Sequence, residues 1–245
     1  MGATDPVLLL PPSEGKTEGG RAPTRPGAFA TRLGAARAEV IAAFAATTTD
    51  PVVAAKVLGV RGDLLDRARM AMAALADGTA PVRPAAERYS GVVWEHLGPL
   101  AAPQRRRILV PSAVYGITTA ADPVADHRGK LSASLPGVGR LDRFWRDLVT
   151  AAIVHHARGR TVVDLLPQEH AAAVDWDALA AEVEVVRVAF VRADGNGAAG
   201  HGAKAVKGRF ARALLEHGPG RATRFVWDGW RAARDGADIV VRAPV

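Results

Sequence analysis

The sequence predicts a single mixed α/β domain over residues 1–245, with a central sheet surrounded by helices. The chain has 245 residues, 49% of them hydrophobic, which is enough to bury a sizeable core. Short apolar runs typical of buried strands alternate irregularly with stretches of helical periodicity, and this favours a mixed sheet over a regular doubly wound one. No internal repeat or obvious linker divides the chain.

The first third of the chain begins with a strand and continues with helices. Val7 to Leu10 reads as a short buried strand, and two prolines stop it because proline donates no hydrogen bond to a sheet. Ser13 to Gly27 is a polar loop rich in glycine and proline. Residues 28–76 predict two or three helices, one of them capped by Asp50 with Pro51 at its first position.

The remaining elements follow from the same periodicities. Leu141 to Ile153 is predicted helical because its large apolar side chains recur at i, i+3 and i+4. A turn is expected at 81–84 and a loop at 112–123. Further strands are predicted at 108–110, 161–166, 183–191 and 239–242, and a further helix at 206–215.

Composition limits the kinds of function. The net charge of +7 points towards a polyanionic partner, with nucleic acid first and a phosphorylated small molecule second. The absence of cysteine excludes disulfides, thiolate metal sites and cysteine nucleophiles. No zinc spacing or Ser-His-Asp order is recognisable, so we expect neither metal nor cofactor. With no long apolar run and no signal peptide, we expect a cytoplasmic protein without membrane contact.

The segment Gly15-Lys16-Thr17 after the first strand looks like the end of a phosphate-binding P-loop. That motif needs a glycine five residues before Gly15, and the position holds Leu10, inside the strand. Pro11 and Pro12 also remove two backbone amides that would hold a phosphate. The spacing therefore argues against a P-loop.

Several short motifs occur in order over nearly the whole chain. They are the loop PPSEGKT at 11–17, Val114-Tyr115-Gly116-Ile117 followed by Asp122, Phe144-Trp145, Val163 to Glu169, and AKAVKGRF at 203–210. Together these motifs resemble those of the YaaA family of peroxide stress response proteins. His127-Arg128 stands where the family usually has Tyr-Arg. A function that depends on that tyrosine would be altered here.

The resemblance implies a fold peculiar to the family, with a helix-hairpin-helix element and a positively charged cleft. It also implies binding to double-stranded and distorted DNA, and a role in limiting free iron and oxidative DNA damage during peroxide stress. No cofactor is established for the family. Among the matched polar residues, the candidate catalytic ones are Ser13, Lys16, Tyr115, Asp122 and Glu169.

Two segments suggest contacts with phosphate on their own. The turn Leu135 to Arg140 reads as the hairpin of a helix-hairpin-helix, in which glycines permit close approach and the next helix offers free amides. An ordinary glycine turn is an equally good reading. In the 204–215 helix, basic side chains lie opposite apolar ones. The candidate DNA-binding or anion-binding residues are Lys16, Arg128, Gly137, Val138, Gly139, Arg140, Lys204, Lys207, Arg209 and Arg212.

Two functions from different classes follow. The first is a DNA-binding protein of the oxidative stress response, which contacts the phosphate backbone in a basic cleft. The second is an enzyme that acts on a nucleobase, nucleotide or other anionic small molecule, because a tyrosine, a serine and carboxylates suit a polar pocket. In that pocket, Lys16, Arg128 and Lys204 would hold an anion, with Glu169 as general base. A third reading, docking of another protein at Trp227 and Trp230, has only its aromatic residues in support.

Overall fold

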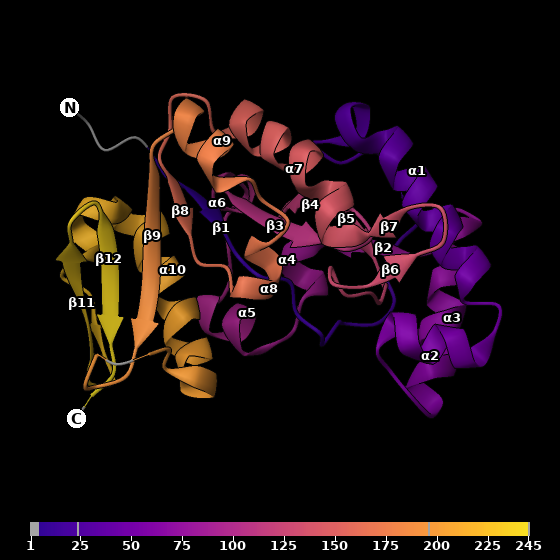
Figure 1. Ribbon diagram of the computed structural model, residues 1–245. Coiled ribbons are helices and arrows are strands. Elements are labelled where there is room, and N and C mark those ends of the chain that lie inside the picture. Colours follow the sequence, from indigo (N-terminus) through magenta and orange to yellow (C-terminus); the bar gives the residue numbers. More distant parts are fainter. Residues whose placement is uncertain (1–4, 24, 196, 245) are drawn as a thin grey trace.

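The computed structural model describes residues 5–23, 25–195 and 197–244. Its centre is an eight-stranded sheet with the order β10-β11-β12-β9-β8-β1-β3-β4 (Figure 1). In chain order these strands are β1 (Val7–Leu9), β3 (Ile108–Ser112), β4 (Gly116–Thr119), β8 (Val162–Asp164), β9 (Val185–Val191), β10 (Val226–Trp227), β11 (Trp230–Asp235) and β12 (Asp238–Arg242).

The middle of the sheet is parallel and its margins are antiparallel. β1 pairs in parallel with β3 and β8, β8 pairs with β9, and β9 pairs with β12. β4 runs antiparallel to β3, and β11 runs antiparallel to both β10 and β12. The predicted mixed α/β fold is therefore confirmed.

Helices surround the sheet. In Figure 1, α7 and α9 lie together along the upper side of the sheet, while α1, α2 and α3 form a group at the far end from β11 and β12. α10 packs against α5. The helix bounds are α1 (Ala30–Thr47), α2 (Pro51–Leu58), α3 (Asp63–Ala76), α4 (Ala85–Arg88), α5 (Val92–Leu97), α6 (Ala102–Arg106), α7 (Leu141–Ala157), α8 (Gln168–Ala171), α9 (Trp176–Glu182) and α10 (Ala203–Ala222). No helix in the described residues is both long and apolar enough to cross a bilayer.

Local predictions mostly agree with the structure. The Asp50 side chain accepts hydrogen bonds from the Val52 and Val53 amides, which confirms the predicted cap of α2. Two expected irregular segments contain strands instead. The loop at 112–123 includes β4, and the turn at 81–84 is largely β2 (Val82–Pro84), which pairs with β5 (Pro123–Ala125). These strands are too short to show a period in the sequence. β4 pairs with β3, which directly precedes it, and β2 pairs with the more distant β5.

The glycine turn before α7 corrects a second expectation. It lies between β6 (Ser134–Leu135) and β7 (Gly139–Arg140), so it is a β-hairpin that leads into α7. Residues 126–133 before it form turns and irregular backbone, so no helix precedes the hairpin in this described segment. Gly137 and Gly139 have φ angles of 77° and 84°, which suit a tight hairpin turn. The helix-hairpin-helix reading was therefore wrong for this segment.

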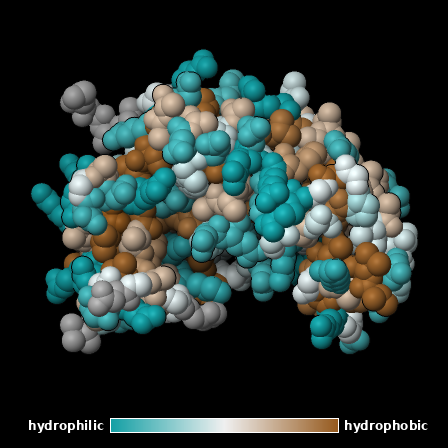
Figure 2. Space-filling view, in the orientation of Figure 1, coloured by the Kyte–Doolittle hydropathy of each residue, from teal (hydrophilic) through white to brown (hydrophobic). Residues whose placement is uncertain are grey.

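An apolar patch lies on the surface of α2 and α3. Figure 2 shows hydrophobic residues gathered at the end of the molecule where these helices lie in Figure 1. The large exposed side chains there are Val52, Val53, Leu64 and Met70. Leu64 also lines the cavity described next, so the patch continues to the rim of the candidate site.

Candidate functional site

The candidate site lies where the parallel strands at the centre of the sheet end. Parallel strands bring their carboxyl ends to the same edge, which is where ligands bind in open α/β sheets. The segments that follow β1, β3 and β8 line two cavities there, of about 460 and 430 Å³. Both cavities are lined by Pro12, Ser13, Glu14, Gly15 and His170, so they adjoin on either side of the loop after β1.

The first cavity gathers several of the residues that the sequence singled out. Ser13 and Lys16 come from the loop after β1, Arg128 from the loop after β5, and Glu169 from α8. Lys130 adds a further cation to the wall. Three segments that are far apart in the chain therefore place both signs of charge around one cavity.

Lys16 is the most perturbed cation in this cavity. Its Nζ donates a hydrogen bond of 3.1 Å to the Ser13 carbonyl and lies 5.8 Å from the centre of the Tyr89 ring. Burial, together with the nearby charge of Arg128, lowers the pKa of Lys16 to about 8. The Arg128 guanidinium in turn donates to the Glu14 carbonyl, which ties it to the same loop.

Ser112 and His127 form a pair at the base of the cavity that sequence reasoning missed. The His127 Nδ1 lies 2.9 Å from the Ala125 carbonyl, so it is the donor nitrogen, and Nε2 faces the Ser112 hydroxyl at 3.4 Å. Burial, with the charge of Lys16 next, holds the pKa of His127 well below its usual range. The imidazole is therefore neutral, and its Nε2 can accept a hydrogen bond from the Ser112 hydroxyl. The sequence signal was the replacement of the family's usual tyrosine by His127.

The second cavity contains Lys204 and Lys207 from α10. Lys204 is exposed, whereas the Lys207 Nζ donates to the Leu165 carbonyl at 2.6 Å and lies 5.2 Å from the centre of the Phe190 ring. Burial lowers the pKa of Lys207 to about 8. Burial also raises the pKa of Asp164, at the end of β8, to about 6. This cavity therefore combines one solvated amine with one desolvated amine.

His170 lies between the two cavities and lines both. Among the described residues its buried Nδ1 has no hydrogen-bond partner, and burial lowers its pKa. Nor do the described residues provide a partner for the buried Oδ1 of Asp126. Buried polar atoms are nearly always paired, so the unsatisfied His170 nitrogen in the cavity walls suggests that a ligand or water completes it.

Two candidate catalytic residues lie behind the site and line neither cavity. The Tyr115 hydroxyl accepts a hydrogen bond from the Ala125 amide, and its ring meets His127 edge to face at 5.2 Å. The Asp122 carboxylate accepts from the amides of Ala28 and Thr119 and from the Thr119 hydroxyl, at 2.8 to 2.9 Å. The structure therefore gives Tyr115 and Asp122 hydrogen bonds within the fold and no place in the wall of either cavity.

Several candidate phosphate-binding residues also lie elsewhere. Gly137, Val138, Gly139 and Arg140 belong to the β6–β7 hairpin, and Arg140 pairs with Asp142 through two hydrogen bonds of 3.1 and 2.5 Å. Arg209 lies over the Trp227 ring, and Arg212 donates to the Pro99 carbonyl and pairs with Glu216 at 3.0 Å. These residues line neither cavity at the strand ends.

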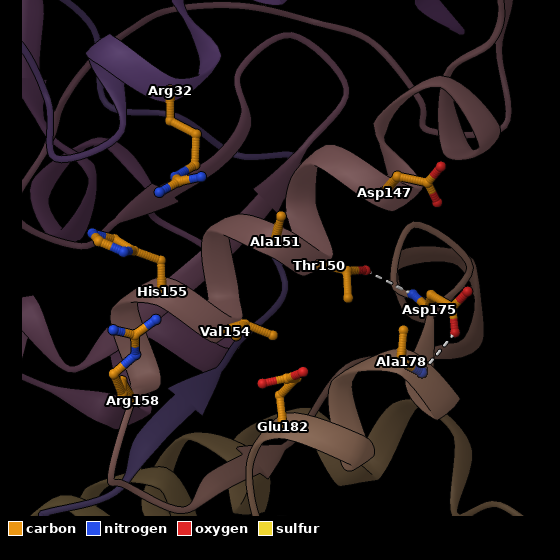
Figure 3. Close-up of a pocket in the computed structure, with 10 residues that line it drawn as sticks. All are labelled: Arg32, Asp147, Thr150, Ala151, Val154, His155, Arg158, Asp175, Ala178 and Glu182. Atoms are coloured by element: carbon orange, nitrogen blue, oxygen red, sulfur yellow. Dashed lines mark hydrogen bonds between the residues drawn. The ribbon is translucent and has the colours of Figure 1, made fainter.

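A third cavity, of about 520 Å³, lies away from the strand ends on the surface of α7 and α9. Figure 3 shows its lining, which includes Arg32, His155 and Glu182. The Thr150 hydroxyl there accepts a hydrogen bond from the Asp175 amide and donates one to the Arg146 carbonyl. Asp175 in turn caps α9 by accepting from the Ala178 amide. None of the residues singled out in the sequence for catalysis or anion binding lies in this cavity.

The donor set at the strand ends suits an anionic ligand. Lysine, arginine and histidine side chains predominate over Glu14 and Glu169 among the charged and titratable groups around the two cavities. No group of three or more His, Cys, Asp or Glu side chains with the spacing of a metal site occurs in the part of the chain that the structure describes. The neutral imidazoles add groups that can accept a hydrogen bond.

The fold and this site together define a mixed α/β protein with a basic, partly desolvated cleft at the carboxyl ends of its central strands. The family model described as peroxide stress protein YaaA matches residues 7–234, and the chain therefore belongs to this family. A UPF0246 protein of Streptomyces coelicolor is 34% identical over 228 residues, covering 86% of this chain and 84% of the relative. A UPF0246 protein of Corynebacterium glutamicum strain R is 31% identical over 219 residues, covering 85% and 84%.

Proposed function

We propose that this peroxide stress protein binds double-stranded or distorted DNA along the two adjoining cavities, and so limits iron-driven oxidative damage. One observation carries the proposal. Five cations, Lys16, Arg128, Lys130, Lys204 and Lys207, line cavities that meet at the loop after β1. Cations divided between two adjoining cavities suit successive phosphates of a backbone better than one compact anion.

The physical link to iron is counterion release. A protein that neutralises phosphates displaces the cations condensed on DNA. Ferrous iron held in that counterion layer would be displaced with the rest, which would move the site of hydroxyl radical formation away from the sugars and bases. Protection of this kind requires that the protein occupy the DNA. It does not require an iron site in the protein.

A titration of labelled duplex and bubble DNA at several salt concentrations tests the proposal. We expect log K to fall linearly with log salt, with a slope of about −0.9 for each phosphate contact. The Lys130→Ala/Lys204→Ala double variant should bind every sequence more weakly and reduce the slope by up to about 2. The control is Lys56→Ala, because Lys56 is exposed on α2 and lines neither cavity. Absence of binding at low salt, or binding indifferent to salt, would contradict the proposal.

A second candidate is an enzyme that acts on a nucleotide or another anionic small molecule. The observation that favours it is the cluster of desolvated groups, Lys16, His127 and His170, because simple attraction of a phosphate backbone needs no buried imidazole. In this reading Glu169 is the general base. Glu169→Gln should leave DNA binding intact or slightly tighter and abolish any turnover. If turnover of a nucleotide survived this change, the role of Glu169 would be wrong.

A further inference from the structure

The amine of Lys16 has surroundings that a purely electrostatic contact does not require. It is fixed by the Ser13 carbonyl at 3.1 Å and lies on the face of the Tyr89 ring. The charges of Arg128 and Arg88 act against its protonation, while those of Asp126 and Glu14 favour it. In the described residues no carboxylate comes within the 4.0 Å of an ion pair with this amine.

These surroundings favour a reactive amine. A lysine that serves only to attract phosphate keeps its usual pKa and its solvent, as an exposed side chain does. A lysine that is desolvated and lies beside other cations is instead the usual nucleophile towards carbonyl carbon, because its neutral form is populated near neutral pH. Burial lowers the pKa of Lys16 to about 8, so a fraction of the amine carries a free lone pair at pH 7.

The walls of the same cavity supply what an incoming carbonyl compound would need. Arg128 and Lys130 line the same cavity as Lys16 and can hold a phosphate. His170 lines the cavity with a buried Nδ1 that has no partner among the described residues, so it can carry a proton. The nucleophile, the anion site and the proton carrier therefore come from three separate segments and meet at one cavity.

We propose that Lys16 forms an imine with the aldehyde of a phosphorylated sugar. The Nζ lone pair attacks the carbonyl carbon, and the π electrons move to the oxygen. The nitrogen loses its two protons in turn to His170, which passes each of them to the oxygen, so that the oxygen leaves as water and a C=N bond replaces C=O. One water is released, and no oxidant or reductant is required. The aldehyde comes either from an abasic site in DNA, which rests on the proposed function, or from a free sugar phosphate.

Reductive trapping tests this proposal. The full-length protein is mixed with a duplex that contains one abasic site, or with ribose 5-phosphate, and the imine is reduced with sodium cyanoborohydride to a stable secondary amine. Intact mass and peptide mapping then identify the modified lysine. The chain has five lysines, at 16, 56, 130, 204 and 207, so the assignment is direct. We expect the adduct on Lys16, and Lys16→Arg should reduce its yield about tenfold or more while keeping the cation.

Lys56→Arg is the matched control, since Lys56 is an exposed lysine outside both cavities, and its adduct yield should equal that of the unmodified protein. Peptide mapping of the unmodified protein needs no variant, so it identifies the lysine that carries the adduct even if Lys16→Arg folds poorly. Trapping with only one of the two reagents supports the proposal and identifies the source of the aldehyde. No adduct with either reagent, or adducts spread evenly over the lysines, would overturn it.

Binding of the abasic duplex without reductant separates this proposal from the proposed function. Binding of the abasic duplex without an adduct would reject imine formation and leave the proposed DNA binding intact. An adduct with ribose 5-phosphate in the absence of DNA binding supports imine formation and rejects the DNA proposal.

Discussion

Gly208 in α10 meets the carbonyl oxygen of Val93 in α5 so closely that a Cβ added at Gly208 would lie 2.3 Å from that oxygen. The added carbon would also lie 2.8 Å from the His96 Cβ and 2.9 Å from the Leu97 amide nitrogen. Two of these three neighbours are backbone atoms, which cannot move aside without moving the helix. Gly208 therefore sets the distance between α10, which supplies Lys204 and Lys207, and α5, which borders the second cavity.

Replacing Gly208 by alanine should destabilise the protein by about 2 kcal/mol or more, because the helices would have to separate. The sign of the change in unfolding free energy is the test, since replacing glycine by alanine inside a helix normally stabilises a protein by up to about 1 kcal/mol. Urea unfolding followed by circular dichroism measures the change. Gly34→Ala in α1 is the matched control, because its added Cβ meets nothing within 4 Å and should stabilise slightly. Equal stabilisation of both variants would contradict this packing.

The fold was largely predictable because its central strands are continuous apolar runs. The residues of β1, β8 and most of β3 were assigned correctly since strands buried on both faces need no alternation to be recognised. β4 was missed because Gly116–Thr119 has only four residues and begins with a glycine, which the sequence suggests is part of a loop. The β6–β7 hairpin was mistaken because a glycine turn before a helix looks the same after a strand as after another helix.

The candidate site was predictable only in part. Ser13, Lys16 and Glu169 follow strands that the sequence shows, and strand ends are where such residues gather. On α10 the apolar face was correct, with Val206, Phe210 and Leu214 fully buried. The basic face was not one surface, because Arg209 and Arg212 find partners at Trp227 and Pro99, distant positions that no helical period reveals. The Ser112–His127 pair was missed because its two residues belong to different segments, and no periodicity in the sequence shows that they meet.

Asp122 is expected to stabilise the fold, because its carboxylate accepts three hydrogen bonds and joins the start of α1 to the end of β4. Asp122→Ala should destabilise by about 2 to 4 kcal/mol, since it leaves buried donors unpaired. Glu39→Ala, on the exposed side of α1, should change stability by less than about 0.5 kcal/mol. Denaturant unfolding measures both. If Asp122→Ala kept full stability but lost function, the residue would belong to the catalytic machinery.

The raised pKa of Asp164 predicts a dependence of stability on pH. The folded pKa is about 6 and the usual value is 3.8, so the folded protein binds the extra proton between these two pH values. The cost of the buried charge is therefore fully present above about pH 6 and is relieved as pH falls towards 3.8. Asp164→Asn removes the charge but keeps an oxygen that can accept from the Leu166 amide, which now donates at 2.8 Å.

At pH 7.5, Asp164→Asn should stabilise the protein by about 1 to 3 kcal/mol, and the gain should vanish near pH 4. Thermal unfolding at pH 4, 6 and 7.5 checks this. Glu39→Gln, on the solvent-exposed side of α1, should show no such trend. A stability gain that is the same at all three pH values would mean that the Asp164 pKa is not raised.

The lowered pKa of Lys16 predicts that DNA binding weakens as pH rises from 7 to 9. With a pKa of about 8, Lys16 is mostly cationic at pH 7 and mostly neutral at pH 9, whereas an ordinary lysine near 10.5 stays charged. Lys207, also near 8, adds to the loss. We expect the affinity to fall severalfold and the salt slope to decrease by about 1 for each lost contact. The Lys16→Arg variant keeps its charge, so its DNA affinity should depend less on pH. The affinity of the Lys56→Arg variant should follow that of the unmodified protein. If the slope of log K against log salt were unchanged between pH 7 and 9, neither buried amine would contact phosphate.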